Sequence, residues 1–265
     1  MSSTPPATTQ PPPAKPLPAP PAPSSRMLSG LGEAWAVFRK DLLSELRTRY
    51  ALNALLVFAL TTLLLVAMTV VTQGQGLTRL PGGEVGQTAA RATLLAGLLW
   101  IILFFSGMSG LARAFVKEEE ARTAPALRLA AQPLAVFFGK MLFNVALLVA
   151  MALLIVPLFV LFLKPDVKDG ALLLAETVLG SASLACVTTI LGAIVARAES
   201  RASLFAALAF PIVLPVLVIV VNGTAAAFAG GPPSEEARNQ LVGLVSYVVM
   251  LVTLSAWLFE QVWRD

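Results

Sequence analysis

The sequence predicts an all-α integral membrane protein with six transmembrane helices. Two observations support this fold class. Of its 265 residues, 57% are hydrophobic and 13% are charged, whereas a soluble domain is about 45–50% apolar and about 25% charged. The chain also contains six separate apolar runs, each reaching the roughly 20 residues that cross about 30 Å of hydrocarbon. Lipid must therefore solvate much of the surface, because the polar residues are too few to cover so apolar a chain.

The N-terminal residues 1–26 form a tail of Pro, Ala, Ser and Thr with almost no large apolar side chains. Ten of the 19 prolines lie there. Such a segment cannot bury enough apolar surface to offset the entropy of ordering it, so we expect it to be disordered. It has no apolar core of the kind that signal peptides carry. The membrane domain is therefore expected to span residues 27–265.

An amphipathic stretch follows between Glu33 and Arg49. Its apolar residues recur at helical spacing and its basic residues lie off that stripe, which is typical of a helix lying in the membrane interface. The alternative is a basic lead-in to the first span, and the regular stripe favours the interfacial helix. The stripe consists of Trp35, Phe38, Leu42 and Leu46.

The six apolar runs define the predicted spans and leave only short connections. The third is long enough to require tilt or an interfacial end. No connection is long enough for a folded domain outside the membrane. The predicted spans are 50–72, 92–114, 136–163, 171–196, 203–222 and 241–262.

The distribution of Lys and Arg predicts the orientation of the chain. With the N-terminus in the cytoplasm, 14 of the 19 basic residues fall in internal segments and five in external ones. Because basic residues are retained on the cytoplasmic side, both termini are expected there. We therefore expect a multi-pass membrane protein with both ends in the cytoplasm.

The residue types exclude several kinds of chemistry. The chain has no histidine and a single cysteine, Cys186, so it cannot build the usual multi-ligand metal or haem site, and we expect no metal site or bound cofactor. It lacks the glycine-rich loop with Lys and Ser or Thr that binds nucleotide phosphates, so any ATPase must be a separate chain. A membrane-embedded enzyme would need clustered carboxylates or histidines, and the adjacent glutamates at 118–120 lack the spacing of a metal site. We therefore expect a protein that is not an enzyme.

A few residues inside the spans are functional candidates. Glu176 lies about a turn and a half into the fourth span, where it either reaches the outer interface or lines an outer vestibule. Pro157, Pro211 and Pro215 each remove a backbone donor and can kink their helices. A static bend is the simpler interpretation, and a flexing point for gating is the alternative. Small residues around Gly180 predict close packing between helices.

The internal segment 115–135 is the strongest candidate for a binding surface, because it is longer and more charged than a simple return to the bilayer requires. An amphipathic helix parallel to the membrane could dock there on a soluble partner, and a solvated charged turn is the alternative. The residues expected to make the contact are Phe115, Lys117, Glu118, Glu119, Glu120, Arg122, Leu127 and Leu129.

These features together resemble the ABC-2 type permeases, and more specifically the haem exporter B (CcmB) family of the bacterial cytochrome c maturation system. The resemblance covers roughly residues 33–263. It rests on the order and spacing of weak motifs, which are Leu94 through Trp100 to Arg113-Ala114-Phe115, Gly139-Lys140-Met141 with Pro157, Leu179-Gly180, and Leu214-Pro215 after Pro211. One departure is that Glu119-Glu120-Ala121-Arg122-Thr123 replaces a glycine-containing acidic stretch that is usual in the family.

The resemblance implies a permease subunit of an ATP-driven complex that exports haem or releases a haem chaperone in cytochrome c biogenesis. The 115–135 segment would couple the motion of an ABC ATPase subunit, which binds the ATP, to the spans. Other implied partners are a second integral haem-handling subunit, a periplasmic haem chaperone and a second copy of the chain. Haem would be cargo of the complex. The alternative is a general ABC-2 exporter of lipid, polysaccharide or drug.

Overall fold

The computed structural model describes residues 23–72, 83–111, 132–195, 201–230 and 234–264. Within these ranges the chain is helical apart from short turns and contains no strand. The helices are α1 (Pro23–Thr48), α2 (Tyr50–Thr72), α3 (Gly83–Leu111), α6 (Pro133–Leu163), α7 (Gly170–Val195), α8 (Arg201–Ala229) and α9 (Ser234–Arg264).

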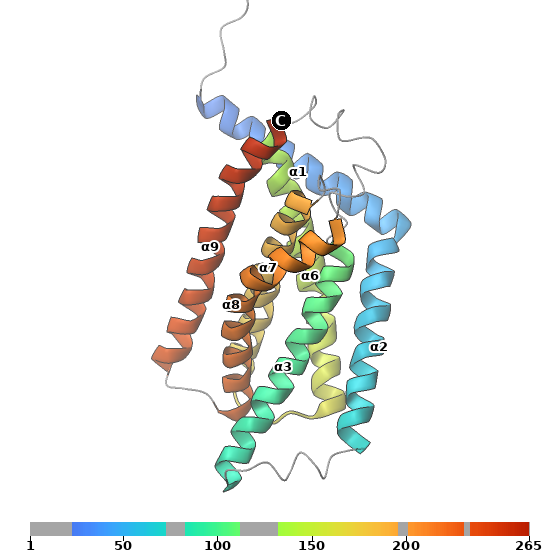
Figure 1. Ribbon diagram of the computed structural model, residues 1–265, viewed down its shortest axis with the longest axis vertical. Helices are drawn as coiled ribbons and strands as arrows, with labels where there is room; N and C mark the ends of the chain where they lie inside the picture. Colours follow the sequence, from blue (N-terminus) through green and yellow to red (C-terminus); the bar gives the residue numbers. More distant parts are fainter. Residues whose placement is uncertain (1–22, 73–82, 112–131, 196–200, 231–233, 265) are drawn as a thin grey trace, which may run out of the picture.

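Six of these helices form a bundle, and α1 lies across one end of it (Figure 1). The end of α9 lies at this same end, which we call the α1 end; the opposite end, where α7 begins, is the far end. All six bundle helices, α2 to α9, are long and apolar enough to cross a membrane. The predicted all-α membrane fold with six spans is therefore confirmed.

A sharp corner joins α1 to α2 at Arg49, whose φ of 53° lies in the left-handed region. The buried carboxylate of Glu45 accepts the backbone N–H of Leu52 at 2.9 Å, so it satisfies one of the free donors at the start of α2. On α1 itself, Val37 is buried against the bundle whereas Trp35 is 59% exposed. Two residues of the predicted stripe, Trp35 and Leu46, are thus more than half exposed, and contact of the stripe with the membrane interface stays a prediction.

Helix α7 is the central helix of the bundle. It packs against α3, α6, α8 and α9. Of its membrane-crossing residues 61% are buried inside the protein, compared with 22% for α2 and 17% for α9. Its sequence is rich in Gly, Ala, Ser and Thr, and small residues let neighbouring helices approach closely. The outer helices instead expose large apolar side chains such as Leu65 and Val249, as expected of surfaces that face lipid.

Several helices extend beyond the boundaries expected from the sequence. Helix α3 begins at Gly83 rather than 92, and α9 at Ser234 rather than 241. Helix α1 begins at Pro23, so the last residues of the predicted 1–26 tail are helical; proline is well tolerated in the first turn of a helix because no donor is needed there. Helix α8 continues past the predicted end at 222 to Ala229, through small residues that keep the helix intact, and stops at Gly230 with a φ of 83°.

Candidate functional site

The eight residues predicted to dock an ATPase all lie in 112–131, outside the residues that the structure describes. Their role stays a prediction. The structure does describe Gln132, which lies near the end of the predicted coupling segment 115–135 and directly before α6, so that residues 133–135 of that segment form the start of α6. The backbone N–H of Gln132 donates to Oε2 of Glu33 on α1 at 2.8 Å. The exit of the segment is therefore bonded to α1 as well as continuous with α6.

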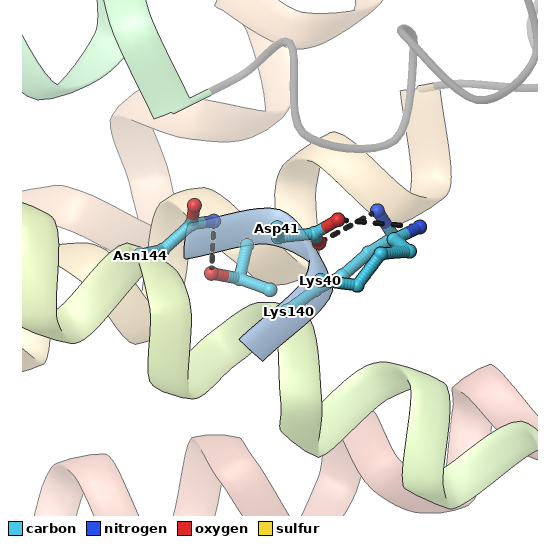
Figure 2. A network of polar contacts seen from close by, with 5 residues as sticks. Lys40, Asp41, Lys140 and Asn144 are labelled. Carbon is cyan, nitrogen blue, oxygen red and sulfur yellow. Dashed lines mark hydrogen bonds and ion pairs between the residues drawn. The ribbon is translucent and has the colours of Figure 1, made fainter. Parts of the chain in front are cut away.

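A buried ion pair joins α1 to α6 near the same end (Figure 2). Lys140 of α6 is 1% exposed, and its Nζ lies 3.2 Å from Oδ2 of Asp41 on α1. Lys40 Nζ lies 3.2 Å from the other oxygen, Oδ1, of the same carboxylate. An ammonium group with so little solvent requires a charged partner, and Asp41 supplies it.

The backbones of α1 and α6 also touch directly beside this pair. A Cβ atom built on Gly139 would lie 2.6 Å from the carbonyl oxygen of Ala34 and 2.7 Å from Cβ of Val37. Only glycine fits at this crossing, because the nearest atom belongs to the backbone of α1 and cannot rotate away. We call Glu33, Asp41, Gly139 and Lys140 the α1 clamp, since together they hold α1 against the start of α6.

Sequence reasoning identified Gly139 and Lys140 as part of a family motif but missed their structural role. Asp41 was missed altogether. The signal in the sequence is Lys140, which is the one ionisable residue of the apolar helix α6. A buried lone cation predicts an acidic partner on a packed helix, but α1 offers Glu33, Asp41 and Glu45, so the partner could not be chosen from the sequence.

A second polar contact lies deeper in the bundle. Asn144, one helical turn after Lys140, donates from Nδ2 to Oγ1 of Thr189 on α7 at 2.8 Å (Figure 2). Both side chains are buried. In a hydrophobic setting such interhelical hydrogen bonds fix the rotation of one helix against another. This contact ties α6, and through it the α1 clamp, to the central helix α7.

A different polar cluster lies where α3, α7 and α8 meet. Nε1 of Trp100 donates to Oγ1 of Thr224 at 2.8 Å, and both side chains are about 1% exposed. The ring of Trp100 packs on Gly180, where a Cβ atom would overlap ring atom Cη2. Gly180 thus makes the close helix approach that the small residues of the fourth span predicted.

Glu176 lies one helical turn before Gly180 and belongs to the same cluster. Its side chain is fully buried, at 0% exposure, and its carboxyl packs against the backbone of Gly223 on α8. Neither carboxyl oxygen has a hydrogen-bond partner. In the isolated chain Glu176 is thus inside the bundle rather than at its surface, and a role in an outer vestibule stays a prediction. We call Trp100, Glu176, Gly180, Gly223 and Thr224 the polar seam.

The three prolines lie within helices, Pro157 in α6 and Pro211 with Pro215 in α8, and all three side chains are exposed. Helix α8 changes direction along its length (Figure 1). Between its two prolines, the carbonyl of Ile212 accepts a hydrogen bond of 2.9 Å from the hydroxyl of Tyr247 on α9. Whether this region is a static bend or a gating point stays a prediction.

Side chains that commonly bind metal ions are scattered over the part of the chain that the structure describes. No group of three or more His, Cys, Asp or Glu side chains gathers there. Cys186 is buried in α7 as a free thiol. The carboxyl and thiol groups of the described residues therefore do not gather into a set of metal ligands.

Comparison with known proteins adds the family. A family model described as "CcmB protein" matches residues 32–261, a range that runs from within α1 to the last turn of α9. No curated protein matches the chain. The family consists of membrane permease subunits rather than enzymes, and it supports a role in haem export by an ABC transporter and assembly with other subunits of the cytochrome c maturation system. The chain therefore belongs to the CcmB family of multi-pass membrane permease subunits.

Proposed function

We propose that this chain couples ATP hydrolysis on a separate ABC ATPase chain to movement of its own spans, through segment 115–135 and the α1 clamp. The movement serves haem export, or release of a periplasmic haem chaperone, during cytochrome c biogenesis. The family match supports the pathway. The bond between Gln132 and Glu33 supports the route of coupling, because the segment ends directly on the clamp.

The proposed route has three steps. Displacement of segment 115–135 by the ATPase pulls on Gln132, and so on both α1 and α6. The Asp41–Lys140 pair and the crossing at Gly139 make α1 and α6 move together at this end. The bond between Asn144 and Thr189 passes that movement to α7, the central helix. The first step relies on an exposed hydrogen bond and on the continuity of Gln132 with α6, whereas buried polar pairs and close backbone packing supply rigid contacts for the other two.

The orientation belongs to the same proposal. The protein lies in the inner membrane of a bacterium. Its α1 end and both of its termini face the cytoplasm. The basic residues of α1 and of the corner after it support this, since Arg39, Lys40, Arg47 and Arg49 all lie at that end. The ATPase then approaches the α1 end from the cytoplasm. Another integral subunit or a second copy of the chain contacts the bundle within the membrane, and the haem chaperone approaches from the periplasm.

Complementation of a deletion strain tests the function. Loss of the gene is expected to abolish covalently attached haem in c-type cytochromes, measured by haem staining, and the wild-type gene is expected to restore it. Normal cytochromes c in the deletion strain would refute the proposed function.

Charge reversal tests the coupling segment in the same strain. The double variant Glu119→Arg with Arg122→Glu is expected to reduce both co-purification of the ATPase and cytochrome maturation. The matched control is Asp166→Lys with Lys168→Glu, which reverses an exposed ion pair of 2.6 Å at the far end. An unchanged pull-down for the first double variant would rule out this segment as the docking site.

A further inference from the structure

Among the side chains that the structure describes in the six spans, Glu176 is the one buried acidic residue, and the coupling route does not use it. It is 0% exposed within the chain, and both of its oxygens are without a hydrogen-bond partner. Gly223 on the facing helix α8 leaves just enough space for it, because a Cβ atom there would overlap its carboxyl oxygen Oε1. The carboxyl is therefore enclosed by the α7–α8 contact rather than directed to lipid or water.

Among the side chains that the structure describes on the neighbouring elements, none donates a hydrogen bond to this carboxyl. The described side chains of α8, from 211 onward, include no ionisable residue. Trp100 of α3 directs its indole N–H to Thr224 and not to Glu176. On α6, Lys140 is engaged by Asp41 at the α1 end. The remaining ionisable side chains described on the packed elements are Arg91 of α3, Lys164, Asp166, Lys168 and Asp169 of the α6–α7 turn, Cys186 of α7, and Glu235, Arg238 and Tyr247 of α9.

The same bundle shows what a compensated buried charge looks like. Lys140 is as enclosed as Glu176, but it has a carboxylate 3.2 Å away. An ionised carboxylate with no cation or donor would pay a desolvation penalty far larger than that of the neutral acid. A group in this position takes up a proton instead, which leaves an uncharged carboxylic acid in the contact.

We propose that Glu176 is a proton-binding site of the permease, neutral while α7 and α8 are in contact at the polar seam and ionised when that contact opens to water. On opening, the O–H bond of the carboxylic acid breaks, the electron pair stays on the carboxylate and the proton passes to water. Closure reverses these steps. Since the neutral form belongs to the closed seam, a rise in pH favours the open one.

The location of the site gives the proton a conformational meaning. Glu176 lies on the central helix, and its contact Gly223 lies on α8, the helix that carries Pro211 and Pro215. Any separation of α7 from α8 that admits water at this depth exposes the carboxyl. Opening is thereby linked to the loss of one proton, so the opening equilibrium changes by at most about tenfold per pH unit.

Infrared spectroscopy of the purified full-length protein in lipid tests the protonation state directly. The carbonyl stretch of a neutral carboxylic acid is expected at neutral pH in the wild type and is expected to be lost in Glu176→Gln, which keeps the shape of the side chain. Absence of this band in the wild type, or its persistence in E176Q, would overturn the proposal. If E176Q does not fold, the wild-type protein is instead produced with ¹³C-labelled glutamate, which is expected to shift the band because it labels the carboxyl carbon. A band that does not shift would not come from a glutamate and would overturn the proposal equally.

Hydrogen–deuterium exchange tests the link to opening. Peptides covering 170–180 and 220–229 are compared between wild type and E176Q at each pH, which cancels the intrinsic pH dependence of exchange. At low pH the two proteins are expected to exchange equally, and as pH rises the wild type is expected to exchange progressively faster. The variant Gly243→Ala is the control, because a Cβ atom there meets nothing within 4 Å. Equal exchange of wild type and E176Q at every pH would refute the link. Neither measurement depends on the cargo of the transporter.

Discussion

The α1 clamp and the polar seam solve the same packing problem with opposite electrostatics. Each uses a glycine to bring two elements into direct contact, Gly139 at the clamp and Gly180 at the seam. Each places a polar contact beside that glycine. The clamp carries full charges, with Asp41 between two lysines. The seam has one neutral hydrogen bond, between Trp100 and Thr224, and an acid without a partner.

The difference follows from the distance of each site to water. Asp41 keeps 14% of its side chain exposed at the end of the bundle, so its charge is partly solvated as well as paired. Glu176 has no such access. Charged pairs are therefore suited to fixing the interfacial helix to the bundle, whereas neutral hydrogen bonds are suited to contacts that lie within hydrocarbon. The stability of the clamp should depend on charge, and that of the seam on close packing and one neutral hydrogen bond.

Removing the acid of the clamp is expected to have the largest effect. Asp41→Ala deprives the buried Lys140 of its carboxylate and should cost about 3 kcal/mol of unfolding free energy. Lys140→Met should cost less, about 1 kcal/mol, because Asp41 is partly exposed and retains Lys40. Thermal unfolding in mild detergent measures both, with the exposed Arg39→Ala as the control. Equal losses for the two variants would contradict a clamp that depends on charge.

Adding a methyl group to the two close approaches should have the next largest effect. Gly139→Ala and Gly180→Ala are each expected to destabilise the protein by about 1–3 kcal/mol, because one forces α1 from α6 and the other displaces the ring of Trp100. Gly97→Ala, whose new Cβ atom meets nothing within 4 Å, is the matched control and should be neutral or slightly stabilising. If G139A or G180A behaved like G97A in unfolding assays, close packing would not distinguish these sites.

Breaking the hydrogen bond of the seam should cost about 1–2 kcal/mol, because Thr224→Val leaves the buried indole N–H of Trp100 unpaired. Combining it with Trp100→Phe in a double-mutant cycle isolates the bond from the packing of the ring. A favourable coupling energy of about 1 kcal/mol is expected from unfolding titrations. A coupling energy near zero would show that shape alone holds the seam.

The smallest effect is expected for Glu33→Gln, since the bond from Gln132 lies in an exposed position and an amide oxygen can still accept it. Stability should change by less than about 0.5 kcal/mol. Because Glu33→Gln keeps the bond, ATPase activity of the assembled complex should respond to the permease as in the wild type. Glu33→Ala removes the acceptor, so this response should weaken if the coupling route is correct. A wild-type response in Glu33→Ala would remove Glu33 from the route.

The sequence alone determined that this protein lies in a lipid bilayer, and hence its fold class. Six apolar runs with few charges predict membrane-spanning helices, because each backbone polar group in lipid must be hydrogen-bonded within its own segment. The amphipathic stripe of α1 and the small residues of α7 were visible for the same reason, since both are periodic patterns along one helix. The family followed from the order of weak motifs and was confirmed by the match over 32–261.

Only the tertiary structure decided which polar residues meet. Asp41 and Lys140 are 99 positions apart, and Trp100 and Thr224 are 124 apart. Nothing in a helical period specifies which helix lies opposite, so neither contact could be predicted. Glu176 was predicted near the outer surface of the membrane because the sequence shows how far along α7 it lies. The sequence does not show that α8 covers it. Depth along a helix is a local property, but burial depends on the neighbours that packing brings.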